Sequence, residues 1–167
     1  MSNSCAKARL YIDVPLKDGD IITLPSAQMH YLLHVLRLRV GAPIAVFNGV
    51  DGEFLAIINK ILKKKCLISV KMRLRPQIQC RDLWLLFAPI KKARQDFIAQ
   101  KASELGVRVI WPVKTEFCQV SRVNDERLVA NAIEAAEQTK RLDIAEVKPF
   151  SNLLDALQEI ENDRLLI

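Results

Sequence analysis

The first part of the chain alternates hydrophobic and polar residues at the two-residue period of a β-strand, as Ala8-Arg-Leu-Tyr-Ile-Asp13 shows. Between Met29 and Leu36 the hydrophobic residues are instead three to four positions apart, as on the buried side of a helix, and Ser26 can cap its start. These patterns predict a small β-barrel with one inserted helix. The expected strands cover residues 8–13, 20–24, 43–47, 53–61 and 66–74.

From residue 81 onward, strand-like and helix-like segments alternate. Leu83-Trp-Leu-Leu-Phe-Ala88 is a continuous hydrophobic run, which is typical of a strand covered on both faces. The alternation predicts a parallel sheet with right-handed crossovers, and therefore an α+β chain with two domains, residues 1–75 and 76–167, divided near Pro76. The expected strands cover residues 83–88, 107–111, a short segment around Val147 and 165–167, and the expected helices cover residues 91–105, 124–140 and 152–161.

The basic residues are concentrated in the first expected domain. Residues 1–75 carry 12 basic and 5 acidic side chains, a net charge of +7, whereas residues 76–167 carry 13 and 14, a net charge of −1. A basic module joined to a neutral one indicates that the first domain faces nucleic acid and the second does other work. Charge alone fits a solvated basic surface equally well.

Several classes of protein are excluded by composition. Half of the residues are hydrophobic, which is too many for a disordered chain. The longest apolar run, residues 83–90, is shorter than the roughly 18 residues of a transmembrane helix, and residues 1–9 lack the apolar core of a secretory signal. The four cysteines are far apart, which argues against a disulfide scaffold or zinc ribbon and predicts free thiols in the cytoplasm; they are Cys5, Cys66, Cys80 and Cys118.

Two histidines lie four residues apart on the first expected helix. His30 and His34 have the spacing of two metal ligands, but no acidic or cysteine third ligand is near in sequence. A packed helix face is therefore the better interpretation, and no metal is expected. Arg37 and Arg39 follow, and this polar edge can meet phosphates or lie exposed to solvent.

The second domain has a cationic helix start directly after a strand. Lys91-Lys-Ala-Arg94 opposes the helix dipole, and a polyanion bound there would remove the conflict; a plain solvated turn is the alternative. Glu137 and Arg141 have the spacing of an ordinary helix salt bridge. The five glycines form no phosphate-binding loop such as G-x-G-x-x-G or a Walker loop.

A set of short segments recurs together in the order and spacing of one enzyme family. They are His30, Val35-Leu-Arg37, Gly41, Phe47-Asn-Gly49, Lys91-Lys-Ala-Arg-Gln-Asp96, Gln100-Lys-Ala-Ser-Glu-Leu-Gly-Val107, Pro112, Thr115-Glu116 and Glu134-Ala-Ala-Glu-Gln-Thr-Lys-Arg141. Together they cover nearly the whole chain. They resemble the RsmE family, the 16S rRNA uridine-N3 methyltransferases of the SPOUT superfamily.

The resemblance implies a PUA-like β-barrel followed by an α/β domain of SPOUT (α/β-knot) type. Members are homodimers that use S-adenosylmethionine to methylate 16S rRNA of the small ribosomal subunit. Phe117 stands where many members have Arg, and Ala145 where Pro is frequent. The family's Gly-Pro-Glu-Gly-Gly segment and knot are not in these 167 residues, so we expect the second domain to be incomplete at its carboxyl end and the cofactor site to lie beyond residue 167.

The same resemblance implies roles for individual residues. Either Arg94 or Arg141 would stabilise the negative charge that develops on the uracil. Lys91 and Gln138 would line the cleft beside them, and the supporting residues would be Lys101, Glu104, Thr115 and Glu137. Flanking rRNA would be held by His30, Arg37 and the hairpin residues Lys63, Lys64 and Lys65.

Two other functions remain open on the sequence. One is a binding module that holds RNA without catalysis, as a fragment or a decayed methyltransferase. The other, less favoured, is a metal-dependent hydrolase that uses His30 and His34.

Overall fold

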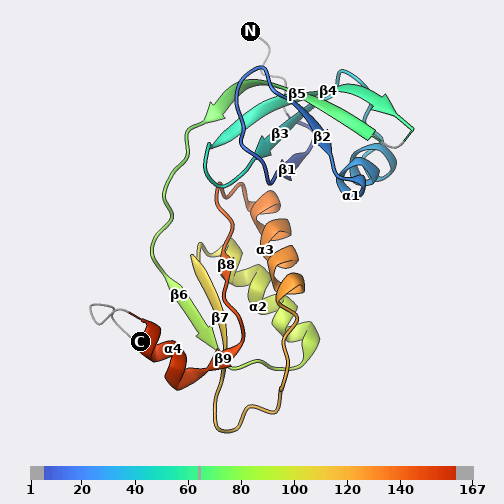
Figure 1. The fold of residues 1–167 in the computed structure, drawn as a ribbon. Helices are drawn as coiled ribbons and strands as arrows, with labels where there is room; N and C mark the ends of the chain where they lie inside the picture. The colour runs from blue at the N-terminus through green and yellow to red at the C-terminus, as the bar shows by residue number, and fades with distance from the viewer. Residues whose placement is uncertain (1–5, 64, 161–167) are drawn as a thin grey trace. The chain divides into compact units, whose positions relative to one another are not determined.

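The structure is a computed structural model that describes residues 6–63 and 65–160. It divides into two compact units, Met1–Gln79 and Cys80–Ile167, and the division falls a few residues beyond the one expected from the sequence (Figure 1). Lys64 and the strand expected at residues 165–167 lie outside the described residues. No helix in the described part of the chain is both long and apolar enough to span a membrane.

The first unit is built on a five-stranded sheet with the order β1-β3-β4-β5-β2. β1 pairs with β3 in parallel, and the other neighbours are antiparallel. The alternation seen in the sequence places every second side chain in the core, as Phe54, Ala56 and Ile58 show on β4. The strands are β1 (Arg9–Tyr11), β2 (Ile21–Leu24), β3 (Pro43–Phe47), β4 (Glu53–Leu62) and β5 (Lys65–Arg75).

The inserted helix begins as α1 (Ser26–His30) and continues as a π-helical turn, η1 (Tyr31–Val35). In η1 the Leu36 amide donates to the carbonyl of Tyr31, five residues earlier, at 3.0 Å. The predicted cap is wrong, because Pro25 occupies the N-cap and Ser26 is already helical. The helical segment ends at Val35, and Arg37, two residues later, has a left-handed φ of 54°.

A buried ion pair and a close backbone approach lie where β4 begins and β5 ends. Glu53, only 6% exposed, accepts a hydrogen bond from Arg9 Nε at 3.0 Å and also pairs with Arg75. Gly52 beside it has a φ of 95°, and a Cβ there would collide with the Arg75 carbonyl and lie 2.9 Å from the Gln77 amide nitrogen. Only glycine fits this position.

The second unit holds the parallel sheet that the sequence predicts. β7 is its centre and pairs in parallel with β6, β8 and β9. One expectation is wrong: β6 is only half-buried, because among the described residues it pairs on one side alone, and β7 is the covered strand. The elements are β6 (Trp84–Phe87), α2 (Lys92–Glu104), β7 (Val109–Lys114), α3 (Asp125–Thr139), β8 (Glu146–Val147), β9 (Ser151–Asn152) and α4 (Leu153–Glu159).

The two faces of β7 support different layers. Ile110 packs in the cluster that includes residues of α2 and α3, whereas Trp111 packs in the cluster that includes Ala156 of α4. In that second cluster Trp84 and Trp111 lie with their ring centroids 6.1 Å apart. The ammonium of Lys148 is 4.5 Å from the Trp111 ring and 5.2 Å from the Trp84 ring, and it also pairs with Glu159.

Candidate functional site

The carboxyl ends of β6 and β7 open onto a cavity of about 380 Å³. Parallel strands bring their carboxyl ends to one edge of a sheet, which is where α/β sheets commonly bind ligands. Residues before α2 line one part of the cavity, and the loop after β7 lines another. The lining includes Lys91, Arg94, Thr115, Phe117 and Cys118. The sequence prediction grouped three of these residues, Lys91, Arg94 and Thr115, and the structure brings them together.

The cavity is electropositive on the side of α2. Lys91 is the N-cap of α2, and the first turn of the helix contains no acidic residue. The exposed side chains of Lys91 and Arg94 have no partner among the residues the structure describes. The nearest carboxylate on α2, Asp96, is held by Arg127 at 2.7 Å and by Asn131 at 3.0 Å. Two cations therefore add to the positive end of the helix dipole, and the combination favours an anion.

The loop after β7 is held in place by its own hydrogen bonds. The Cys118 amide donates to the Thr115 carbonyl at 3.1 Å. The Cys118 thiol lies 3.5 Å from the carbonyl of Val120 and 3.8 Å from that of Pro89. Phe117, between these points, is 87% exposed. In the sequence, Phe117 stood out only as a departure from a family pattern. The residues around it gave no reason to place it in the cavity.

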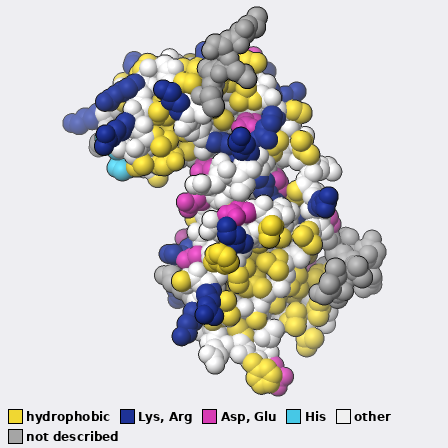
Figure 2. All heavy atoms as spheres, turned by 180° about the vertical axis from the view of Figure 1, so that it is seen from behind, with side chains coloured by type: hydrophobic (Ala, Val, Ile, Leu, Met, Phe, Trp, Pro, Cys, Tyr) yellow, Lys and Arg dark blue, Asp and Glu magenta, His cyan; other side chains and the backbone are white. Residues whose placement is uncertain are grey.

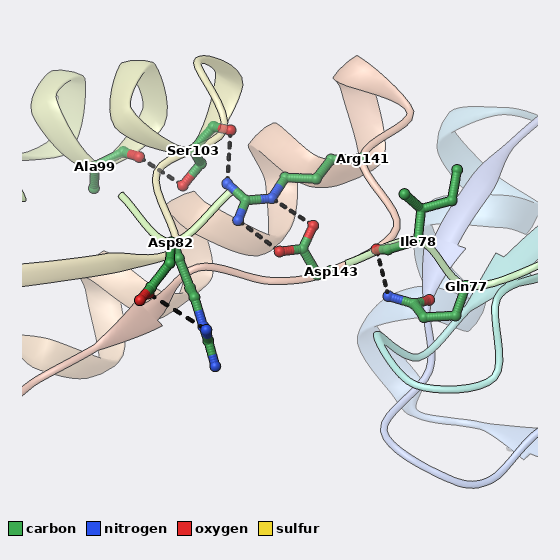
Figure 3. A network of polar contacts seen from close by, with 8 residues as sticks. Gln77, Ile78, Asp82, Ala99, Ser103, Arg141 and Asp143 are labelled. Carbon is green, nitrogen blue, oxygen red and sulfur yellow. Dashed lines mark hydrogen bonds and ion pairs between the residues drawn. The ribbon is translucent and has the colours of Figure 1, made fainter. Parts of the chain in front are cut away.

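The structure does not bring Arg141 to this cavity. α3 ends at Thr139, and Lys140 takes a left-handed φ of 61°, so Arg141 lies just beyond the end of the helix. The Arg141 guanidinium donates to the Ser103 carbonyl at 2.9 Å, near the end of α2 (Figure 3). Arg94 is in the first turn of α2, and the rise of the helix between Arg94 and Ser103 is about 14 Å.

Arg141 is instead the centre of a polar network. It donates two hydrogen bonds of 2.8 Å to the Asp143 carboxylate, and its side chain is only 8% exposed (Figure 3). Burial acts to raise the pKa of Asp143, but hydrogen bonds from Arg141 and Cys80 outweigh it and hold that pKa below its ordinary value. This arrangement stabilises the fold and leaves Arg141 little freedom to contact a substrate.

The remaining predicted residues of the second unit lie away from the carboxyl-edge cavity. Lys101 and Glu104 form a 2.6 Å ion pair on α2, and their hydrogen bond lowers the pKa of Glu104. Gln138 lines a separate cavity of about 160 Å³ together with Gln100 of α2 and Asn131 of α3. Glu137, on α3, is half-buried.

The first unit has a groove of about 480 Å³ between the helical segment and the β4–β5 hairpin. It brings together Arg37 and Lys63, two of the residues expected to hold RNA, and adds His34 and Arg39. His30 lies beside His34, with ring centroids 4.9 Å apart. Figure 2 shows dark blue Lys and Arg side chains gathered on this unit beside a His side chain.

The other residues considered for this basic surface are Lys64 and Lys65, for RNA, and the two histidines, as metal ligands. Lys65 is exposed at the start of β5, and Lys64 lies outside the described residues. Among the residues that the structure describes, no group of three or more His, Cys, Asp or Glu is placed to hold a metal ion. The hydrolase alternative therefore gains no support from the geometry around His30 and His34.

Comparison with known proteins gives matches over both units. Residues 77–167 match the family model described as an RNA methyltransferase domain, and residues 24–71 match the one described as an RNA methyltransferase PUA domain. Ribosomal RNA small subunit methyltransferase E of Rickettsia conorii is 37% identical over 155 residues, which make up 92% of this chain and 64% of that protein. The chain thus spans less than two thirds of that relative's length.

Solved structures agree with these matches. A Legionella pneumophila structure in complex with the cofactor SAM has 28% identity and a TM-score of 0.82, over 96% of this chain and 69% of that one. Ribosomal RNA small subunit methyltransferase E of Neisseria gonorrhoeae, bound to S-adenosyl methionine, has 27% identity and a TM-score of 0.82, over 93% and 66%. Because the methyltransferase family model covers more than half of the chain, the resemblance seen in the sequence is confirmed: the chain belongs to the RNA methyltransferase family.

Proposed function

We propose that this chain belongs to an enzyme that methylates N3 of a uridine in 16S rRNA of the small ribosomal subunit, with S-adenosylmethionine as the methyl donor. The observation that carries the proposal is the order of the two matches, a PUA domain at residues 24–71 and an RNA methyltransferase domain at residues 77–167. The names of the similar proteins support the substrate, and the SAM-bound structures support the donor.

The first unit would hold rRNA that flanks the target. Its groove presents Arg37, Arg39 and Lys63 at one surface, and contacts between such cations and phosphates supply affinity without reading the base sequence. His34 adds a ring and a hydrogen-bonding group to the same groove. The groove would therefore position the RNA, and the second unit would act on the base.

Arg94 is the better candidate for the catalytic cation. When the proton leaves N3 of uridine, negative charge spreads onto the carbonyl oxygens, and a fixed cation beside them stabilises it. Arg94 faces the cavity, has Lys91 beside it, and has no partner among the described residues. Arg141 is held by Asp143 and Ser103, so a positioning role in the fold suits it better.

The carboxyl-edge cavity fits RNA better than it fits the donor. A sulfonium carries a positive charge, and Lys91 and Arg94 would repel it. Donor sites also need close approach of the backbone, and the cavity has no glycine among its lining residues. We therefore place the donor site, with the SPOUT knot and the homodimer contact, in the length of the relatives that has no counterpart in these residues. The donor would supply an electrophilic methyl group.

The test is methylation of small ribosomal subunits by the complete gene product. Subunits that lack the modification would be incubated with donor carrying a labelled methyl group, and the nucleosides would be separated by mass spectrometry. We expect label in N3-methyluridine, and a strong loss of label for Arg94→Ala with an unchanged unfolding curve. Label in another nucleoside would contradict the proposed target. Binding of the subunit without any transfer would favour the non-catalytic RNA-binding module.

A further inference from the structure

Phe117 is an aromatic ring that the second unit's own folding does not bury. It is 87% exposed, although large aromatic side chains gain considerable free energy from leaving water. The loop that carries it is fixed on both sides, by the bond from the Cys118 amide to the Thr115 carbonyl and by the Cys118 thiol. The ring is therefore presented to solvent by a held loop, at the rim of the carboxyl-edge cavity.

The charges around Phe117 indicate the chemical class of ligand that the ring would contact. The cavity that it lines also contains Lys91 and Arg94, and no carboxylate is among its lining residues. Glu116 precedes Phe117 in the loop but is exposed and does not line the cavity. A flat apolar surface next to two cations matches a nucleotide, which has a flat base and an anionic phosphate. Hydrophobic ligands without charge would leave both cations unused.

We propose that Phe117 is a stacking platform for an unpaired base of the RNA substrate, with the phosphate of that nucleotide against Lys91 and Arg94. The proposal rests on the RNA-directed function given above and adds a positioning residue to it. Aromatic side chains stack on any base through its π-face, so Phe117 would hold the base in place without selecting its identity. Selection of uridine would then fall to groups that contact its edge.

The first experiment locates the base by photocrosslinking. The 167-residue chain would be irradiated with a short oligouridylate that contains 5-iodouridine, and the crosslinked tryptic peptides would be sequenced. We expect a crosslink in the peptide Thr115–Arg122, which contains Phe117. It should disappear in Phe117→Leu, which keeps an apolar side chain without a π-face. It should persist in Leu105→Ala, a control at an 81% exposed residue that does not line the cavity.

A binding measurement separates base from phosphate. Phe117→Ala should weaken binding of oligouridylate about tenfold, leave an abasic oligonucleotide unaffected, and keep the salt dependence, while Phe117→Trp should restore binding. Crosslinks confined to the first unit, or equal affinity of Phe117→Ala and the unaltered chain for oligouridylate, would overturn the stacking role alone. If the unaltered chain bound neither oligonucleotide, the RNA-directed function would fail, and the stacking role with it.

Discussion

Replacing Arg141 with alanine should destabilise the second unit rather than impair a catalytic step. Arg141 ties the segment after α3 to the end of α2 through the Ser103 carbonyl and the Asp143 carboxylate. Its side chain is 8% exposed and that of Asp143 is 20% exposed, so little water can replace the lost hydrogen bonds. The variant leaves a half-buried carboxylate whose remaining hydrogen bonds come from the Cys80 thiol and the backbone of Asp143 itself.

The expected loss follows from these contacts. A hydrogen bond to a charged group contributes about 1.5–3 kcal/mol, and removing one partner of a fully buried ion pair costs about 3–5 kcal/mol. Asp143 keeps some exposure, which places the expected loss near the lower end of the second range, at about 3 kcal/mol. Arg127 offers a matched comparison, because it also makes two hydrogen bonds to one carboxylate but is 49% exposed.

The assay is urea unfolding of Arg141→Ala and Arg127→Ala, followed by far-ultraviolet circular dichroism. We expect a clearly lower midpoint for Arg141→Ala and a much smaller change for Arg127→Ala, with unchanged slopes. Adding Asp143→Ala to Arg141→Ala should recover part of the loss, because no unpaired carboxylate remains. If Arg141→Ala unfolded like the unaltered chain but lost methylation in the complete protein, the reasoning would be refuted and Arg141 would be a catalytic residue.

Four further predictions concern Gly52, the pH response of Asp143, Lys63 and binding of the methyl donor. Gly52→Ala should lower the thermal stability far more than Gly19→Ala. Both positions have a positive φ, which costs a residue with a Cβ about 1–2 kcal/mol, but only at Gly52 would the Cβ also collide with backbone atoms. Equal losses of stability would show that no such collision occurs. The folded-state pKa of Asp143 lies below its ordinary 3.8, so its stabilisation should be complete above that pH and lost as the pH falls through the folded-state pKa. Asp143→Asn should reduce the dependence of stability on pH in this acidic range. An unchanged dependence would show that Asp143 does not cause it. Lys63→Ala should weaken RNA binding and reduce its salt slope by about one in filter binding, whereas an unchanged slope would remove Lys63 from the interface. Calorimetric titration of the 167-residue chain with S-adenosylmethionine should give no heat, and saturable one-to-one binding would place the donor site among these residues.

Much of the fold could be predicted because hydrophobic residues recur along the chain at the regular spacings of strands and helices. Strand alternation in the first unit and the strand–helix order in the second both correspond to the observed elements. The π-helical turn could not be predicted, since five residues are too few to distinguish its period from that of an α-helix. The exposure of β6 could not be predicted either, because its run of hydrophobic residues does not say how many neighbours the strand has.

The candidate site was predictable only where local sequence carried a reason for it. Lys91 and Arg94 could be predicted as site residues because they place positive charge at the positive end of a helix dipole, which is unfavourable without an anion. The separation of Arg141 from the carboxyl-edge cavity was not visible in the local sequence, although the end of α3 was predicted to within one residue. The partner of Arg141, Ser103, lies 38 positions away, and such a contact depends on how α2 and α3 pack. The role of Phe117 depends on tertiary structure in the same way.

The paired indole rings against α4 give the molecule a built-in optical label. Trp84 and Trp111 are the only tryptophans in the sequence, and both belong to the second unit, whereas Tyr11 and Tyr31 belong to the first. Emission excited at the red edge of indole absorption therefore originates in the second unit alone. Because the Lys148 ammonium lies over both rings, that emission should respond when the charge moves, for example on loss of its pairing with Glu159. Changes in the second unit can thus be followed on their own, without any added dye.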